Sequence, residues 1–228
     1  VSKLAHIHFV ANSKAQSRLL QLGERENSIY IIGSPDLDIM RSNFLPELNE
    51  VKERYEIKFD SYAVFMHHPV TTDLRPARQP MVRPLNYIVI YPNNDDGSDV
   101  IIKELSRLQG NSKFRVFPSI RFECFLTILK NALFIIGNSS AGIREMPFYG
   151  LPTINLGNRQ ENRSNANSII NSQESSHKIL ESIEIALASK FDSEFEFGNG
   201  NSGALFFKAL NKEDLWLTST QKIFQTFE

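Results

Sequence analysis

Short runs of β-branched and aromatic residues alternate with amphipathic segments along most of the chain. Runs that predict strands lie at residues 6–10, 28–33, 62–66, 87–91, 114–117, 133–136 and 153–156. Helical spacing occupies residues 13–22, 37–55, 100–108, 122–131, 179–188 and 213–227, and a further helix follows residue 140 and ends near Gly150. This alternation predicts an α/β fold, a Rossmann-like doubly wound parallel sheet with helices on both faces.

One stretch interrupts the alternation. Between the predicted strands at 62–66 and 87–91, the segment Leu74–Pro84 contains three prolines where a crossover helix is expected. Eleven residues with three prolines cannot form an ordinary helix between parallel strands. Either the fold is irregular here or part of the natural sequence is missing, and both interpretations stay open.

Composition narrows the function classes. The 228 residues are 41% hydrophobic, enough for one large domain, and the net charge of -1 gives no sign of a nucleic-acid partner. Cys124 is the single cysteine, so we expect a reducing, cytoplasmic compartment. No apolar run approaches the ~20 residues needed to cross a bilayer. The chain opens at Val1 without a methionine or a signal peptide, and we interpret it as a fragment or a processed chain.

The segment from Phe134 to Glu145 carries the first candidate chemistry. An apolar run leads into the turn Gly137-Asn138-Ser139-Ser140, and a helix follows. The free N–H groups at a helix start, together with the positive end of the helix dipole, attract a phosphate. Ser139 and Ser140 add two hydroxyls, while Glu145 suits the hydroxyl pair of a ribose. A serine-rich turn that merely caps its helix is the alternative.

Other polar residues follow the predicted strands at their carboxyl ends, where ligands bind in open α/β sheets. His68 could donate to a phosphate or act as a catalytic acid, and Asn93 could orient a ribose or a phosphate. Arg159 and Arg163 could each bind a phosphate through two parallel hydrogen bonds. Each has a structural alternative: a histidine bonded to a backbone carbonyl, or an arginine that is only a solvated charge. Phe125, on the helix after Ser119-Ile120, could stack on a nucleobase or pack in the core. The sequence contains no metal-ligand cluster and no dinucleotide, Walker A or nucleophile-elbow motif, so we expect neither a metal nor a cofactor.

Several motifs together resemble one known family. They are Ser2–His6 with Gly33–Asp36, His67–Asp73, Tyr91–Asp95 with Gly97-Ser98, Gly137–Glu145, and Asn155–Gln160. These resemble the C-terminal part of the UDP-N-acetylglucosamine 2-epimerases across nearly the whole chain. The form Ser-Ser-Ala-Gly of the turn at 139–142 resembles the hydrolysing branch, which makes N-acetylmannosamine for sialic acid synthesis.

The resemblance implies a specific site. Ser139 and Ser140 would bind the diphosphate and Glu145 the ribose hydroxyls. His68, Asn93 and Arg159 would line the UDP site, with Ile120 and Phe125 near the uracil and Arg163 as a further candidate. These candidates are His68, Asn93, Ile120, Phe125, Ser139, Ser140, Glu145, Arg159 and Arg163.

The resemblance also implies an architecture and a reaction. Residues 1–211 would form the second, UDP-binding domain of a two-Rossmann-domain, glycosyltransferase-type fold. A helix in 212–228 would pack toward a first domain that carries the proton-transferring carboxylates. The fragment alone would then be inactive, and the full-length enzyme a homo-oligomer acting on UDP-N-acetylglucosamine. A non-hydrolysing epimerase, a related glycosyltransferase and a non-catalytic nucleotide-sugar binding domain are the alternatives.

Overall fold

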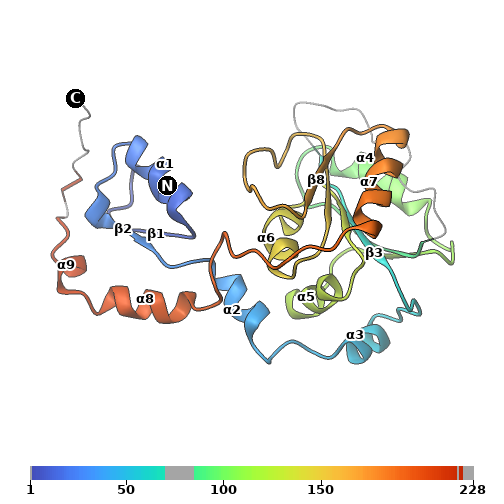
Figure 1. Cartoon of the computed structure of the whole chain (residues 1–228), viewed down its shortest axis with the longest axis horizontal. Helices are drawn as coiled ribbons and strands as arrows, with labels where there is room; N and C mark the ends of the chain where they lie inside the picture. Colours follow the sequence, from blue (N-terminus) through green and yellow to red (C-terminus); the bar gives the residue numbers. More distant parts are fainter. Residues whose placement is uncertain (1, 70–84, 220, 223–228) are drawn as a thin grey trace. The chain divides into compact units, whose positions relative to one another are not determined.

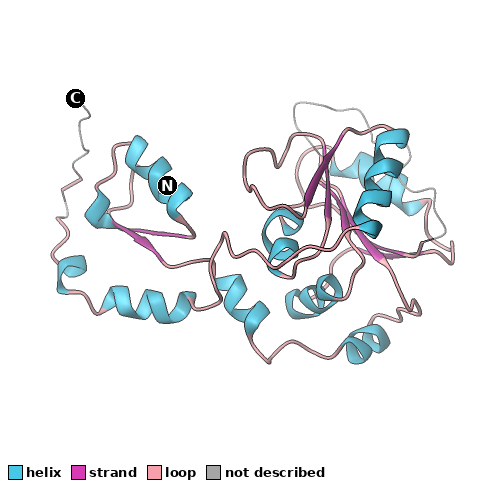
Figure 2. Cartoon of the chain, viewed as in Figure 1, coloured by secondary structure: helices cyan, strands magenta, loops and turns pink. Residues whose placement is uncertain are grey.

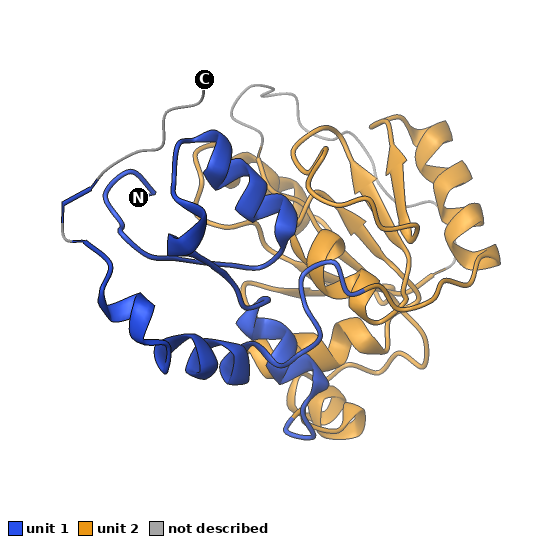
Figure 3. Cartoon of the chain, turned by 60° about the vertical axis from the view of Figure 1, so that its left-hand side comes forward, with its two compact units in different colours: residues 1–44, 195–228 blue, residues 45–194 orange. Residues whose placement is uncertain are grey.

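The chain divides into two compact units. The computed structural model describes residues 2–69, 85–219 and 221–222, so the interrupted segment Leu74–Pro84 lies outside the described residues. Unit 1 consists of residues 1–44 and 195–228, and unit 2 consists of residues 45–194 (Figure 3). These boundaries differ from the expected ranges 1–211 and 212–228, because the two ends of the chain contribute to the same unit.

Unit 2 is built on a parallel sheet with helices around it (Figures 1 and 2). The sheet has six strands in the order β5-β4-β3-β6-β7-β8. The strands are β3 (Ala63–Met66), β4 (Tyr87–Ile90), β5 (Phe114–Phe117), β6 (Ile135–Gly137), β7 (Thr153–Leu156) and β8 (Ile169–Ser172). Every neighbouring pair is parallel. The chain runs outward from β3 through β4 to β5, then returns to the other side of β3 with β6. The strand order therefore reverses between β3 and β6, and the predicted doubly wound α/β sheet is confirmed.

Helices cover both faces of this sheet. They are α3 (Leu48–Arg54), α4 (Ser98–Ser106), α5 (Phe122–Lys130), α6 (Ala141–Phe148) and α7 (Ser176–Ala188). Val64 of β3 packs in one core cluster with residues of α3, α5 and α6. Its neighbour Phe65 packs in a second cluster with residues of α4 and α7. Successive side chains of a strand point to opposite faces, so both faces of β3 are buried, as parallel sheets require.

Two glycines allow the elements around β6 to approach closely. Gly137 has φ +140°, and a Cβ there would lie 2.0 Å from the carbonyl oxygen of Met66 on β3. At Gly142, in the first turn of α6, a Cβ would lie 2.5 Å from Cγ2 of Thr153 on β7. A side chain at either position would push apart the strand-to-helix turn and its neighbouring strands.

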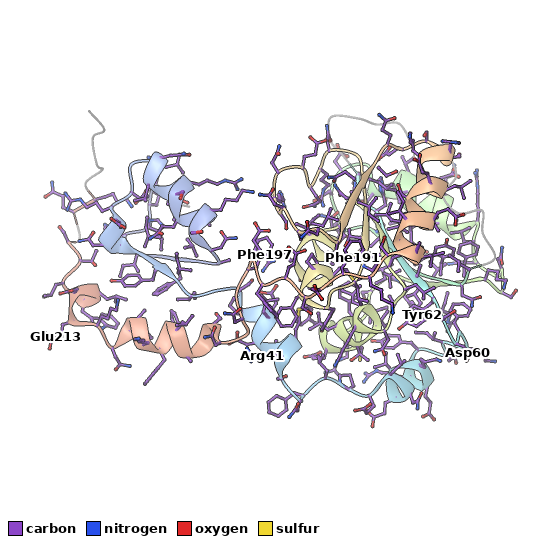
Figure 4. All side chains as sticks on the ribbon, viewed as in Figure 1. Arg41, Asp60, Tyr62, Phe191, Phe197 and Glu213 are labelled. Atoms are coloured by element: carbon purple, nitrogen blue, oxygen red, sulfur yellow. The ribbon has the colours of Figure 1, made fainter. Side chains whose placement is uncertain are left out.

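Unit 1 contains a smaller parallel sheet of its own. β1 (His8–Val10) pairs with β2 (Ile29–Ile31), and around them lie α1 (Ser13–Gln21), the 3₁₀ helix η1 (Glu26–Ser28), α2 (Pro35–Arg41), α8 (Ser202–Leu210) and α9 (Glu213–Trp216). The two segments of unit 1 are joined by hydrogen bonds: Ser34 N–H donates to Phe197 O at 2.8 Å, and Arg41 Nη1 donates to Asn199 O (Figure 4).

The helix expected over residues 37–55 is two helices, α2 and α3. The break covers residues 42–47 and contains Pro46, whose ring disfavours helical backbone at Leu45. The C-terminal helix expected from 213 to 227 was also wrong in its described part, because α9 ends at Trp216. Leu217 follows as the C-cap, and the side chains of Thr218 and Ser219 after it compete for backbone hydrogen bonds and favour turns over helices. None of the helices in the described part of the chain has the length and apolar character needed to cross a membrane.

Candidate functional site

The predicted site residues gather where the strand order of unit 2 reverses. His67 and His68 follow β3, and Asn138, Ser139 and Ser140 follow β6, which is the neighbour of β3. The loops after two adjacent parallel strands diverge at such a switch point and leave a crevice, the usual ligand site of doubly wound sheets. The topology therefore places the predicted phosphate turn and the predicted histidine side by side.

Asn138 connects the two loops directly. Its Oδ1 accepts a hydrogen bond from the His68 backbone N–H at 2.7 Å, and its Nδ2 donates to the His68 carbonyl at 2.9 Å. Sequence reasoning placed Asn138 in the turn but gave it no role. The only local signal was its position as the first polar residue after the apolar run 133–136.

The His68 imidazole is held by Asn93, which follows β4. The Asn93 backbone N–H donates to Nδ1 at 3.1 Å, and the Asn93 Oδ1 lies 2.9 Å from the same nitrogen. A backbone N–H is a donor at any pH, so Nδ1 is best assigned as the acceptor, with the ring hydrogen on Nε2. The Asn93 carboxamide then presents its NH₂ group to Nδ1, an orientation that heavy-atom positions do not distinguish.

Both histidines are buried and favour the neutral form. Burial lowers the pKa of His68, and the nearby Arg159 lowers it further, while the charge of Asp95 acts in the opposite direction. Burial likewise lowers the pKa of His67 to about 4, with smaller contributions from His68 and Arg159. The site therefore contains neutral imidazoles at neutral pH, and its permanent positive charge comes from Arg159.

The serine turn has the form expected from the sequence. β6 ends at Gly137 and α6 begins at Ala141, with Ser139 buried and Ser140 exposed. Ser139 Oγ accepts from the Ala141 N–H at 3.3 Å, so this serine partly caps the helix, as the alternative interpretation proposed. None of the hydrogen bonds described for residues 2–69, 85–219 and 221–222 uses the hydroxyl or N–H of Ser140. Ser140 thus offers two donors at the positive end of α6.

Glu145 lies farther along α6 and is 8% exposed. Its carboxyl group lies close enough to Tyr149 to act on it: burial, and then the charge of Glu145, raise the pKa of the Tyr149 phenol. A carboxylate held at this depth suits a hydroxyl donor such as a ribose and disfavours a phosphate.

Arg159 reaches the turn from the loop after β7. Its Nη1 donates to the Asn138 carbonyl at 3.0 Å, and its Nη2 lies 3.8 Å from Asp95 Oδ2. Gln160, which sequence reasoning did not select, donates from Nε2 to the same carbonyl at 2.9 Å and is 2% exposed. Arg163, by contrast, is exposed, and its described contact is a backbone N–H to Gln160 O at 3.4 Å. The structure brings Arg159 to the switch point and leaves Arg163 on the surface of the loop.

Ile120 lies in the loop that follows β5, and Phe125 lies in α5, the helix after that loop. Both are partly buried and pack against the core cluster that contains Phe117 and Cys124. Part of each side chain is therefore committed to the core, and the remaining exposed part is what a base could contact.

A cavity of about 290 Å³ lies beside the Arg159 loop. Gln160, Asn162, Asn165, Ile143 and Asn171 are among its lining residues. Gln160 Oε1 is buried with no hydrogen-bond donor among the described residues, and the cavity is large enough for several water molecules. Gln160 thus joins a polar cavity on one side to the serine turn on the other.

These features define a class: a doubly wound α/β unit with an anion-accepting crevice at its switch point. Comparison with known proteins gives the family. The family model described as UDP-N-acetylglucosamine 2-epimerase matches residues 1–211, and the chain belongs to this family.

Similar proteins agree with this assignment. A UDP-N-acetylglucosamine 2-epimerase of Neisseria meningitidis is 45% identical over 236 residues, covering 98% of this chain and 62% of the relative. A protein of Campylobacter jejuni, named GDP/UDP-N,N'-diacetylbacillosamine 2-epimerase (hydrolyzing), is 33% identical over 186 residues, covering 76% of this chain and 48% of the relative. The chain therefore spans less than two thirds of the length of these relatives.

Solved structures show the same fold. The UDP-GlcNAc 2-epimerase of Methanocaldococcus jannaschii in complex with UDP-GlcNAc and UDP has a TM-score of 0.65 and 22% identity, with 89% of this chain and 60% of that chain covered. A UDP-GlcNAc 2-epimerase from Neisseria meningitidis bound to UDP-GlcNAc has a TM-score of 0.69 and 15% identity, with 92% and 62% covered.

Proposed function

We propose that this chain is the nucleotide-binding part of a hydrolysing UDP-N-acetylglucosamine 2-epimerase. The observation that carries the proposal is the convergence of His68, Ser139, Ser140 and Arg159 on the switch point of unit 2. Family membership supports the epimerase chemistry. The names of the Campylobacter relative and of a Legionella pneumophila relative at 28% identity support the hydrolysing form.

In the proposed reaction, UDP leaves before water enters. A base removes the proton at C2 of the sugar, the C2–H electrons form the C1=C2 double bond, and the C1–O bond breaks to release UDP. Water then adds to the 2-acetamidoglucal, with hydroxyl to C1 and a proton to the opposite face of C2, and N-acetylmannosamine results. The carboxylates that move these protons would lie on a first domain, toward which residues 212–228 would pack.

The residues of this chain would stabilise the leaving group. Negative charge grows on the diphosphate as the C1–O bond breaks, so donors fixed around it lower the barrier. Arg159 supplies a full positive charge and Ser140 supplies a hydroxyl and a backbone N–H. Asn93 orients the His68 ring, and Glu145 would accept from the ribose hydroxyls. In this proposal Ile120 and Phe125 face the uracil.

Nucleotide binding tests the site with the chain as it is. Arg159→Ala and Ser139→Ala should each weaken UDP binding by roughly 1–3 kcal/mol, because charge-assisted and buried hydrogen bonds contribute free energies of this size. Isothermal titration calorimetry measures the change. Arg107→Ala is the matched control: Arg107 is an exposed arginine of unit 2 paired with Glu104. Equal affinity of all three variants and the parent would remove Arg159 and Ser139 from the site.

Turnover tests the reaction class and requires the full-length protein that contains this chain. Incubated with UDP-N-acetylglucosamine alone, it should release UDP and free N-acetylmannosamine, which proton NMR resolves. Formation of UDP-N-acetylmannosamine with the nucleotide still attached would indicate the non-hydrolysing reaction. A strict need for an acceptor would indicate a glycosyltransferase, and UDP binding without any product would indicate a non-catalytic binding domain.

A further inference from the structure

The strongest unexplained feature of the site is the environment of Asn138. This residue is 0% exposed and immediately follows Gly137, the last residue of β6, which is paired with Met66 of β3. Its carboxamide makes the two hydrogen bonds to His68 N–H and C=O described above. The side chain therefore adds a further pair of hydrogen bonds between the segments that follow β3 and β6, beyond the last backbone pairing of the two strands.

The carbonyl of the same residue faces the third loop. It accepts from Arg159 Nη1 at 3.0 Å and from Gln160 Nε2 at 2.9 Å, which uses both lone pairs of the oxygen. One buried residue thus contacts the His68 loop through its side chain and the Arg159 loop through its main chain. Ser139 and Ser140, which follow it directly, are held between them.

We propose that Asn138 is a positioning residue of the nucleotide site, one that fixes His68, the serine turn and Arg159 as a single preorganised set. The inference rests on the proposed function and adds a role for a residue that would not itself contact the nucleotide. The donors of a leaving-group site help only if they are already in place when charge develops, so a link among their three loops has a direct catalytic consequence.

The chemistry at this position is specific to a carboxamide. His68 presents one N–H donor and one C=O acceptor, and the asparagine side chain is complementary to both in one orientation. A carboxylate would place an oxygen against the His68 carbonyl, and an apolar side chain would leave both buried backbone groups without partners, each a substantial penalty.

Asn155 provides a matched control on the adjacent strand. It is 1% exposed, lies opposite Gly137 in the β6–β7 register, and donates from Nδ2 to Asn171 Oδ1 at 2.8 Å. Asn155→Ala therefore removes an equally buried carboxamide whose bond leads to β8 instead of the His68 loop.

The test measures UDP affinity of the whole chain in a double-mutant cycle. Asn138→Ala should weaken UDP binding by about 10-fold or more, and Asn155→Ala by less than about 3-fold. His68→Ala removes the imidazole but keeps the backbone groups that Asn138 bonds. In that background the effect of Asn138→Ala should be smaller than in the parent, because the part that acts through the position of the His68 ring is absent. Equal effects of Asn138→Ala and Asn155→Ala, or full additivity with His68→Ala, would overturn the proposal.

A second pair of variants and a second measurement cover two other outcomes. If Asn138→Ala does not fold, Asn138→Asp keeps the side-chain shape, and Asn155→Asp is the control for the added charge. Asn138→Asp should then weaken UDP binding more than Asn155→Asp does. If the parent chain binds no UDP, the proposed function fails while the positioning role remains testable by hydrogen exchange. Asn138→Ala should then speed exchange at both residues 66–69 and 157–161 relative to Asn155→Ala, and unchanged exchange at either segment refutes it.

Discussion

Gly137→Ala is the substitution with the most sharply defined structural consequence. The added Cβ would lie 2.0 Å from Met66 O and 2.6 Å from Met66 C, whereas carbon–oxygen contacts settle near about 3.3 Å. Relieving the overlap requires β3 and β6 to separate by more than about 1 Å, because both atoms that it meets are backbone. The separation would weaken ladder hydrogen bonds of about 0.5–1.5 kcal/mol each. A further 1–3 kcal/mol, roughly, comes from the positive φ, which an alanine tolerates poorly. The expected loss in free energy of unfolding is therefore about 3–5 kcal/mol.

Gly110→Ala separates the two contributions. Gly110 also has a positive φ, +83°, but a Cβ added there would meet nothing within 4 Å. The Gly110→Ala variant should lose only about 1–2 kcal/mol of its free energy of unfolding, the contribution of the positive φ alone. Urea unfolding followed by far-ultraviolet circular dichroism is the appropriate assay, because the single tryptophan, Trp216, belongs to unit 1 and does not report on β6. If Gly137→Ala is no less stable than Gly110→Ala, the close approach of β3 and β6 is not as described.

Two further predictions concern charge at the site. Because burial holds the pKa of His67 at about 4 in the folded chain against 6.5 in the unfolded one, protons bind the unfolded state first as the pH falls below 6.5. The free energy of unfolding should therefore fall by ~3 kcal/mol between pH 7 and 4. In His67→Phe, urea unfolding should show a fall that is smaller by this amount. The same fall in the variant and the parent would refute the lowered pKa of His67. Asp95→Asn should free Arg159 from the carboxylate 3.8 Å away and tighten UDP binding by about 2–5-fold at low salt, as calorimetry would measure. This gain should fade as salt screens the charges, and weaker binding would contradict it.

Most strands of unit 2 were predictable because they are runs of β-branched and aromatic residues, many of them buried on both faces. Runs such as 87–90 are fully buried and carry β-branched or aromatic side chains, a pattern that few other structures produce. β8 was missed because it is an edge strand of four residues whose isoleucines are only partly buried. Its sequence, Ile-Ile-Asn-Ser, is too short and too mixed to signal a strand without its neighbour β7.

Helix α8 was missed for a different reason. Its N-terminus is stabilised from a distance: the carboxylate of Asp38 accepts the N–H groups of Ser202 and Gly203, each at 2.8 Å. A capping residue more than 160 positions away leaves no local signal. The division into units has the same origin, since residues 1–44 and 195–228 are joined by long-range contacts that local patterns do not encode.

Sequence alone could suggest candidate site residues that directly follow a strand, but not residues whose role depends on which loops meet. The serine turn and His68 follow directly from buried strands, so the rule that ligands bind at carboxyl ends was sufficient to select them. Asn138 and Gln160 required knowledge of which loops meet. That knowledge comes from the strand order, because only the adjacency of β3 and β6 places His68 against the serine turn.

The hydrogen on the His68 ring decides what this residue can do for a leaving diphosphate. Burial and Arg159 lower its pKa, so the imidazole is neutral at neutral pH, and a neutral imidazole is a very weak acid. With the Asn93 N–H directed at Nδ1, the hydrogen lies on Nε2, which can donate to a phosphate oxygen without transferring its proton. We therefore infer a hydrogen-bonding role for His68 in place of general acid catalysis. A diphosphate leaving group needs no protonation, so in the proposed reaction Arg159 would supply the positive charge, and neutral His68 and Ser140 would supply oriented hydrogen bonds.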